Sequence, residues 1–138
     1  QVTFDCADPA GLATFWPEAL GYVSSRLRPG SSRGRAFGAQ MGMPPEAGDG
    51  ISAVVDPDGA GPRVLFLRVP EGKTVKNRVH PDLHVVPPGT PMEERRGALA
   101  GRARELVAKG ATEIGPVEEY GQYWIVMADP GGNGFCLS

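Results

Sequence analysis

The chain has 138 residues, which fits one ordinary domain or two small halves that share a core. A hydrophobic fraction of 41% is enough for a buried core, and a net charge of −2 gives no basic surface for nucleic acid or an anionic membrane. No apolar run has the length of a membrane span and no signal peptide is recognisable, so we expect a cytoplasmic protein with neither nucleic-acid nor membrane partners.

The first half of the chain predicts a strand, a helix and further strands. Residues 2–7 alternate apolar and polar side chains, as a strand does. Asp8 and Pro9 predict a helix start, because a capping carboxylate comes before a proline in the first turn. Apolar residues recur at helical spacing until Gly21, a typical helix end, although Pro17 predicts a kink. Further strands are expected at 22–27, 51–56 and 64–69, with an irregular segment at 28–50 that includes a short interrupted strand near 36–41.

The second half predicts the same elements in the same order. Residues 79–86 form the expected first strand, and Pro91 opens a helix that Gly110 ends. Three strands at 113–117, 123–128 and 134–137 close the chain. The turn sequence VVDPDGAG at 54–61 is repeated as MADPGGNG at 127–134. An internal repeat of this kind predicts two βαβββ modules of about seventy residues each.

The two histidines, His80 and His84, lie four residues apart. Two histidines at this spacing bind one metal ion when they share a face of a helix. Pro81 between them excludes a helix interior, and on a strand the rings would lie roughly 13 Å apart at about 3.3 Å per residue. They therefore do not form a metal pair, and we expect at most one of them to be a ligand. The alternative is that both are hydrogen-bonded or solvent-facing.

Three motifs, in order and at suitable spacing, resemble a known family. They are DPAGLATFW…LGY after the first strand, KNRVHPDL at the start of the second half and DPGGNGFCL at the end. Together they look like the glyoxalase-like branch of the vicinal oxygen chelate superfamily, which includes glyoxalase I, bleomycin-resistance proteins and extradiol dioxygenases. The resemblance implies an α+β fold of two tandem βαβββ modules, whose curved, half-closed mixed sheets carry helices on the outer face.

The resemblance also implies a single glyoxalase-like domain over residues 1–138, with module one at about 1–70 and module two at about 79–138. In this family the concave sheet faces enclose a cavity, and the modules pair within one chain or between two. We therefore expect a homodimer with a small-molecule ligand.

Metal-binding members of the superfamily have ligands at four positions. The resemblance carries these onto Gln1, a site on or near Leu67, His80 and Cys136. Leucine offers no donor atom, and Cys136 stands where the metal enzymes carry a glutamate that also acts as a base. A hard divalent ion needs three or four protein ligands, usually with an anionic oxygen. We therefore expect a degenerate metal set, Gln1 and His80, and no cofactor; a softer divalent metal that uses the Cys136 thiolate is the alternative.

Strand alternation predicts a polar lining for the cavity. If Gln1 points into a cavity, so does Thr3. If His80 points inwards, Asp82 and His84 do so as well. A small polar set of this kind orients a ligand in an otherwise apolar pocket. The expected ligand-binding residues are Gln1, Thr3, His80, Asp82, Trp124 and Cys136.

His80 and Asp82 are also the candidate catalytic residues, since the two could support acid–base chemistry without a metal. The alternative for Asp82 is an ion pair with Arg78 or Lys76. Apolar walls are expected from Trp124, Tyr123, Tyr120, Met41 and Met43, with core or dimer packing as the alternative for Tyr120 and Trp124. An anionic ligand would be attracted by Arg26, Arg33 and Arg35, unless these are ordinary solvated charges.

Three functions are compatible with this sequence. The first is a small-molecule-binding protein with a degenerate metal site that sequesters or senses a drug or a metabolite. The second is a lyase, isomerase or dioxygenase of the same superfamily that uses His80 with an atypical or absent metal. The third is an interaction module with a vestigial pocket. We rank the binding protein first, because the fold pattern is intact while the metal set is not.

Overall fold

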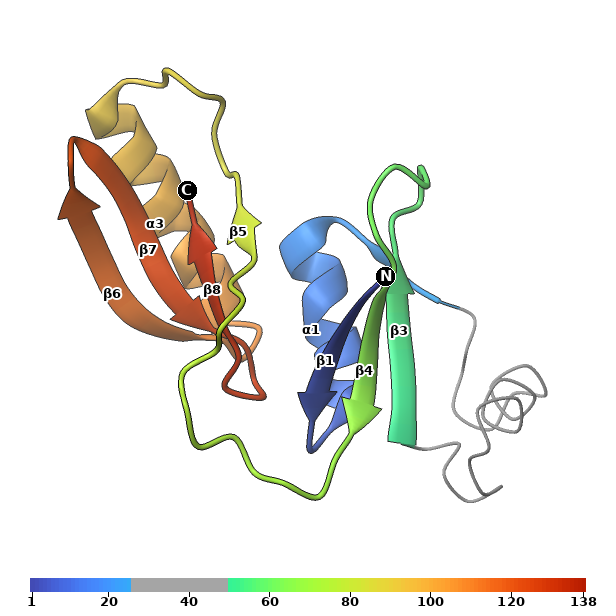
Figure 1. The fold of residues 1–138 in the computed structure, drawn as a ribbon. Helices are drawn as coiled ribbons and strands as arrows, with labels where there is room; N and C mark the ends of the chain where they lie inside the picture. The colour runs from blue at the N-terminus through green and yellow to red at the C-terminus, as the bar shows by residue number, and fades with distance from the viewer. Residues whose placement is uncertain (26–49) are drawn as a thin grey trace. The chain divides into compact units, whose positions relative to one another are not determined.

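This computed structural model describes residues 1–25 and 50–138, and it divides into two units, Gln1–Lys73 and Thr74–Ser138 (Figure 1). Each unit combines a four-stranded mixed sheet with a helix, which confirms the predicted α+β fold of two tandem modules. The strand expected near 36–41 and the segment around it lie outside the described residues. None of the described helices has the length and apolar character needed to cross a membrane.

The first unit forms its sheet from both ends of its sequence. Its elements are β1 (Val2–Cys6), α1 (Pro9–Leu20), β2 (Val23–Ser24), β3 (Ile51–Val55) and β4 (Val64–Arg68). The strand order is β1-β4-β3-β2, so the first strand pairs with the last one. β1 and β4 are parallel, whereas β4, β3 and β2 form antiparallel neighbours.

Helix α1 begins and ends where its sequence predicts. The Asp8 carboxylate accepts a hydrogen bond of 3.1 Å from the Gly11 N–H, which satisfies one of the free donors of the first turn. A Cβ atom at Gly11 would lie 2.5 Å from Asp8 Oδ2, so a larger residue there would require the capping carboxylate to shift. The helix runs through Pro17 and stops at Gly21, whose φ of 71° is a conformation that glycine adopts without strain.

Aromatic side chains fill the space between α1 and its sheet. Phe15 and Trp16 of the helix are fully buried, and so is Phe66 of β4. The ring of Phe4 lies 5.3 Å from that of Trp16 and 6.0 Å from that of Phe66, measured between centroids. Full burial of such a side chain contributes about 1.5–3 kcal/mol, so this cluster stabilises the contact between α1 and the sheet.

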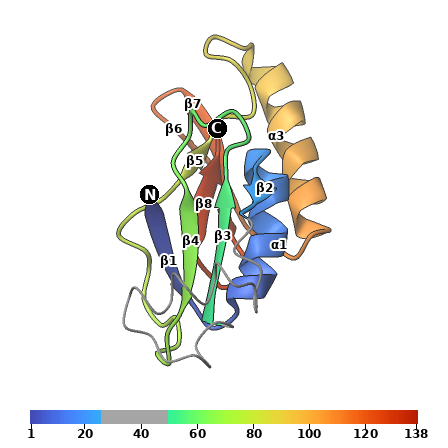
Figure 2. The same cartoon turned by 90° about the vertical axis from the view of Figure 1, so that its right-hand side faces the viewer.

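The second unit has the same topology. Its elements are β5 (Asp82–Leu83), α3 (Met92–Val107), β6 (Thr112–Glu119), β7 (Gln122–Ala128) and β8 (Gly134–Leu137). The strand order is β5-β8-β7-β6, with β5 parallel to β8 and the other neighbours antiparallel. Helix α3 lies along one face of this sheet (Figure 2), and the buried residues Leu99, Ala103 and Leu106 form its apolar stripe.

The strand predicted at 79–86 is much shorter in the structure, where β5 covers two residues. Backbone hydrogen bonds from the Cys136 N–H to the Pro81 carbonyl and from the Val85 N–H to the Ser138 carbonyl extend the pairing slightly beyond it. Val79, which belongs to the predicted strand, lies before β5 and is 73% exposed, so the prediction began the strand too early. Pro81 explains the late start, because its nitrogen has no hydrogen to donate to a neighbouring strand.

The repeated turns are built on the same aspartate in both units. Asp56 accepts backbone hydrogen bonds from Asp58 and Gly61 at 3.0 and 2.6 Å, and these donors lower the pKa of its carboxyl group. Asp129 accepts from the backbone N–H groups of Gly131 and Asn133 at 2.9 and 2.8 Å. The two turns differ in burial, since Asp129 is 2% exposed while the Asp56 turn reaches solvent.

Candidate ligand-binding site

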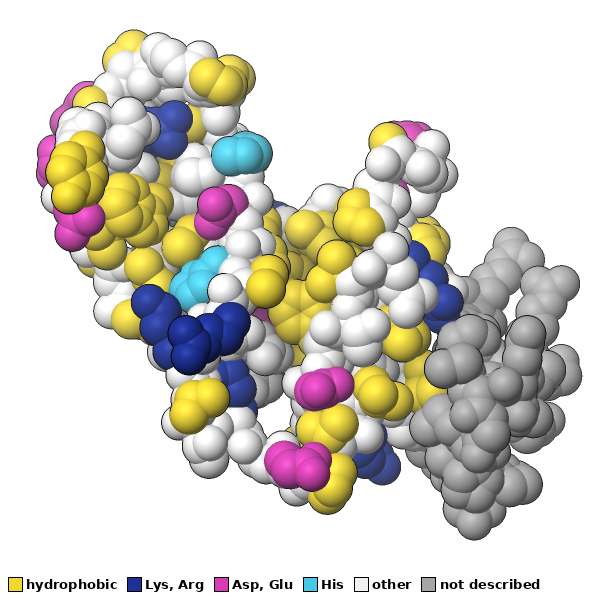
Figure 3. Space-filling view, viewed as in Figure 1, with side chains coloured by type: hydrophobic (Ala, Val, Ile, Leu, Met, Phe, Trp, Pro, Cys, Tyr) yellow, Lys and Arg dark blue, Asp and Glu magenta, His cyan; other side chains and the backbone are white. Residues whose placement is uncertain are grey.

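The face of the second sheet that points away from α3 carries a cavity of about 720 Å³. Val117, Trp124 and Val126 of β6 and β7 give it apolar walls, while Asp82 and Cys136 face it from β5 and β8. The strand register sets Asp82 beside Cys136, and Cys136 beside Val126. Figure 3 shows the histidines on the surface of this unit with hydrophobic side chains nearby. The cavity therefore combines apolar walls with a polar edge, as ligand pockets do.

The polar edge consists of three side-chain contacts. His80 Nδ1 lies 4.0 Å from the Cys136 sulfur, and Cys136 also forms a side-chain hydrogen bond with Asp82. Further along the same face, His84 Nδ1 lies 2.9 Å from Ser138 Oγ. The structure thus brings His80, Asp82 and Cys136 together around one sulfur atom, and their role in binding or catalysis stays a prediction. Among the described residues, Asp82 forms no ion pair with Arg78 or Lys76.

The surroundings of Cys136 keep its side chain protonated. Burial raises the pKa of the thiol, and the charge of Asp82 and its hydrogen bond raise the pKa further. Lys76 acts in the opposite direction but is the weakest of these influences. At neutral pH the group is therefore a thiol, and a thiol is both a poor nucleophile and a poor metal ligand.

Alkylation measures this effect directly. In a Cys6→Ala background, iodoacetamide is expected to modify Cys136 with a pH midpoint above that of an ordinary cysteine, since the raised pKa delays thiolate formation. Asp82→Asn should shift the midpoint to lower pH and speed the reaction several-fold at pH 8, whereas Lys76→Gln should slow it. If both variants react at the parent rate, neither charge acts on the sulfur.

Gly134 positions the imidazole of His80. A Cβ atom at residue 134 would lie 3.3 Å from His80 Cε1, so the glycine lets the ring rest against the start of β8. The Gly134 N–H also donates a hydrogen bond of 3.4 Å to Asn77 Oδ1. One backbone position in β8 therefore holds both the ring and the segment that precedes it.

The chain has two histidines, so an NMR spectrum can follow each ring separately. Gly134→Ala is expected to shift the Hε1 signal of His80 and leave that of His84 unchanged, because the added methyl group displaces only the nearer ring. The matched control is Ser138→Ala, which removes the hydroxyl beside His84 and should move the signal of His84 alone. A Gly134→Ala spectrum with both signals unmoved would contradict the packing described above.

Two predicted site residues, Gln1 and Thr3, belong to the first unit and form a local cluster there. Gln1 Oε1 accepts a hydrogen bond of 3.2 Å from Arg63, and Gln1 Nε2 donates one of 3.5 Å to Thr3. Both residues are exposed on the face of β1 that also carries Asp5. Their part in ligand binding stays a prediction.

The residues at the family's metal positions do not suit a hard divalent ion. The register pairs Val126 with Cys136 in one unit and Ala53 with Leu65 in the other. Val126 and Ala53 each lie three residues before the aspartate of their turn, Asp129 and Asp56, so the two pairs occupy equivalent places in the two units. The counterpart of Cys136 is therefore Leu65, two residues before the predicted position near Leu67. Neither leucine side chain has a donor atom, and Cys136 offers sulfur where a hard ion prefers oxygen. Within the described ranges, no group of three or more His, Cys, Asp or Glu residues could hold a metal ion.

The three aromatic residues predicted to line the cavity differ in exposure and in their contacts. Trp124 is half-buried in the cavity, whereas Tyr120 is 97% exposed at the β6–β7 turn with a φ of 52°, so it is not a core residue. Tyr123 also touches the cavity, and the guanidinium of Arg96, which pairs with Glu118 at 2.6 Å, lies 4.8 Å from its ring centroid. The remaining predicted side chains lie outside the described residues; these are Arg26, Arg33, Arg35, Met41 and Met43.

Sequence reasoning missed several residues of the cavity. Val117, Val126 and Gln122 lie on the same face of the sheet as Trp124. The alternation of strand residues around Trp124 could therefore have predicted that they line the cavity. Arg95 of α3 and Glu119 at the end of β6 also line the cavity. Glu119 shares the strand alternation of Val117 and pairs with Gln122, whereas no strand pattern indicates Arg95, which lies on a helix.

Comparisons with known proteins agree with this fold. A family model described as a glyoxalase-like domain matches residues 1–138. A glyoxalase/bleomycin resistance protein/dioxygenase family enzyme from Burkholderia phytofirmans PsJN has a TM-score of 0.61 and 17% identity, over 99% of this chain and 93% of that one. The fosfomycin resistance protein FosX from Mesorhizobium loti has a TM-score of 0.57 and 13% identity, over 99% of this chain and 86% of that one.

A third structure is a point mutant of FosX from Listeria monocytogenes, with a TM-score of 0.61 and 11% identity over 99% of this chain and 85% of that one. Similarity at these identities shows the fold alone. A sequence comparison with curated proteins found no significant match. The family model nevertheless covers the whole chain, and it confirms the resemblance that the three motifs predicted. The protein belongs to the glyoxalase-like domain family.

Proposed function

We propose that this protein binds a small organic molecule on the face of the second sheet that carries Trp124, and that it does so without a hard metal ion. The observation that carries the proposal is the cavity of about 720 Å³ with apolar walls and a polar edge. The donor set supports the second part, since leucine and cysteine, neither of which offers a side-chain oxygen, stand at two of the four family positions.

The shape and chemistry of the cavity favour a ligand with a flat or aliphatic body. Trp124 offers an indole surface between Val117 and Val126, which stabilises an aromatic or hydrophobic group by contact and by exclusion of water. His80 and His84 offer donors or acceptors at the edge. A drug or metabolite with an apolar body and polar substituents matches this arrangement.

One structural neighbour supports small-molecule binding on this fold. The Listeria FosX mutant is described in complex with Mn(II) and 1S,2S-dihydroxypropylphosphonic acid. We do not carry the metal of that complex over to this chain, because leucine and cysteine stand at two of the four positions that the family resemblance assigns to metal ligands. Sequestration or sensing of a compound therefore fits these residues better than metal-dependent turnover.

A thermal-shift screen with metabolites and antibiotics tests the proposal, because a ligand that binds the folded state raises the melting temperature. The screen is run with and without EDTA, and a hit is expected to give the same shift in both. Fluorescence then locates the hit: Trp16→Phe leaves Trp124 as the single tryptophan, and its emission should change on binding. A hit that needs a metal, or that leaves the Trp124 emission unchanged, would falsify the proposed site.

A further inference from the structure

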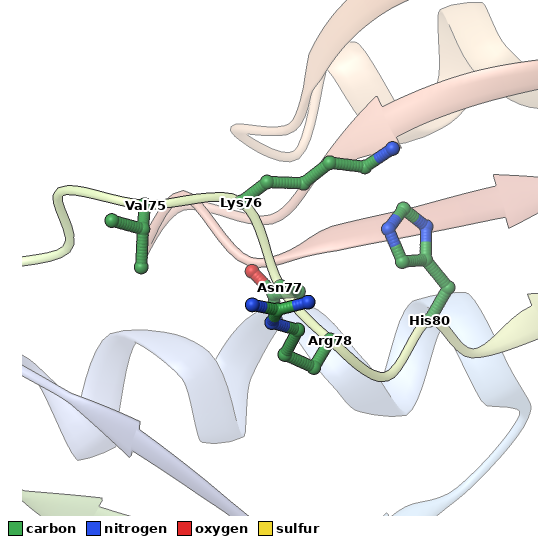
Figure 4. Close-up of a pocket in the computed structure, with 5 residues that line it drawn as sticks. All are labelled: Val75, Lys76, Asn77, Arg78 and His80. Carbon is green, nitrogen blue, oxygen red and sulfur yellow. The ribbon is translucent and has the colours of Figure 1, made fainter.

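A second hollow, of about 630 Å³, lies at the segment that leads into β5 (Figure 4). We call it the cationic pocket; besides Val75, it is lined by Lys76, Asn77, Arg78 and His80. These side chains supply two permanent positive charges, an amide and an imidazole, and no carboxylate is among the described lining residues. Such a set of donors matches an anion.

The segment that forms the cationic pocket is attached to the sheet at two points. Asn77 accepts the hydrogen bond from the Gly134 N–H, and the His80 ring rests against the same glycine. Lys76 and Arg78 lie on either side of Asn77, so both cations project from an anchored stretch of backbone. Anchoring reduces the conformational entropy that an anion would otherwise have to remove on binding.

The cationic pocket adjoins the ligand cavity, because Lys76 and His80 line both. Lys76 also lowers the pKa of Cys136, which means that its ammonium group acts on the centre of the sheet face. In Figure 4 the Lys76 side chain extends towards the same end of the pocket as the His80 ring. An anion held here would lie at one end of the surface formed by Trp124 and Val126.

We propose that the cationic pocket binds the acidic group of the ligand while its apolar body lies on Trp124. The inference rests on the proposed function and adds the ligand class, a small organic acid with a carboxylate, phosphate or sulfonate head. Arg78 can pair with two oxygens of such a head, and Lys76 contributes a point charge.

Two dyes with the same aromatic frame separate the head from the body. The sulfonate 1-anilinonaphthalene-8-sulfonate is the acidic probe, and the uncharged N-phenyl-1-naphthylamine is its neutral counterpart. Titration of the full chain should give about tenfold tighter binding of the acidic probe, because a partly exposed ion pair is worth up to roughly fivefold and two cations contribute. Both probes should lose affinity in Trp124→Ala.

The Lys76→Gln/Arg78→Gln variant should lose about tenfold in affinity for the sulfonate and bind the neutral probe as before. The matched control, Lys73→Gln/Arg104→Gln, removes the same charge from exposed residues that line neither hollow and should bind both probes normally. Circular dichroism of each variant confirms that the fold is intact.

Three outcomes would overturn the inference, and they differ in whether they also refute the proposed function. Equal affinities for the two probes, with both still dependent on Trp124, remove the cationic pocket and leave the proposed function standing. Equal losses in the pocket variant and the control show a net-charge effect, with the same consequence. Binding of neither probe, or binding that ignores Trp124, removes the proposed function together with the inference.

Discussion

Replacing Asp129 with alanine is expected to lower the free energy of unfolding of the second unit by about 3 kcal/mol. The carboxylate is 2% exposed and accepts hydrogen bonds from two backbone N–H groups and from the side-chain amide of Asn133, itself 5% exposed. Removing the acceptor leaves the buried donors of Asn133 and the part-buried Gly131 N–H without this partner, and a buried donor without a partner is costly. Urea unfolding in a Trp16→Phe background, followed by the fluorescence of Trp124, reports on this unit alone.

The repeat supplies the matched control. Asp56→Ala removes the corresponding carboxylate of the first unit, whose donors can bond to water once the acceptor is gone. Its loss of stability, read from Trp16 in a Trp124→Phe background, should be clearly smaller than that of Asp129→Ala. Similar losses at the two positions would mean that burial does not decide the strength of this turn.

Replacing Trp124 with alanine should weaken the binding of N-phenyl-1-naphthylamine about thirtyfold, or about 2 kcal/mol. The indole is the largest apolar surface in the cavity, and its removal leaves Val117 and Val126 to contact the aromatic body of the probe. The half-buried position matters, because a side chain that is already partly desolvated loses little further hydration and little entropy when the ligand covers it.

Two further variants locate this effect. Trp124→Phe keeps an aromatic ring and should recover most of the affinity, which separates stacking from a collapse of the cavity. Tyr120→Ala removes an aromatic side chain at the exposed hairpin tip, outside the cavity, and should bind as the parent does. An affinity for Trp124→Ala equal to that of the parent would place the ligand elsewhere.

The sequence by itself determined the local elements and their order. Asp8, Pro9 and Gly21 mark the ends of the first helix, because capping and left-handed backbone are properties of a few consecutive residues. The repeated turns at 56–61 and 129–134, and the alternating strands on either side of them, are also patterns of a few consecutive residues. Their repetition predicted the two tandem modules. Motifs spread along the whole chain then indicated the family that the family model confirms.

Only the tertiary structure decided which residues of the site act on one another. The parallel pairing of β5 with β8 joins positions more than fifty residues apart. No local sequence pattern therefore predicts the contact between Asp82 and Cys136, or the raised pKa of the Cys136 thiol. Burial is equally non-local: Asp56 and Asp129 begin the similar turn sequences DPDGAG and DPGGNG, yet the first aspartate lies near water and the second is buried. Periodicity and capping depend on neighbours in the chain, whereas charge, solvation and donor geometry depend on neighbours in space.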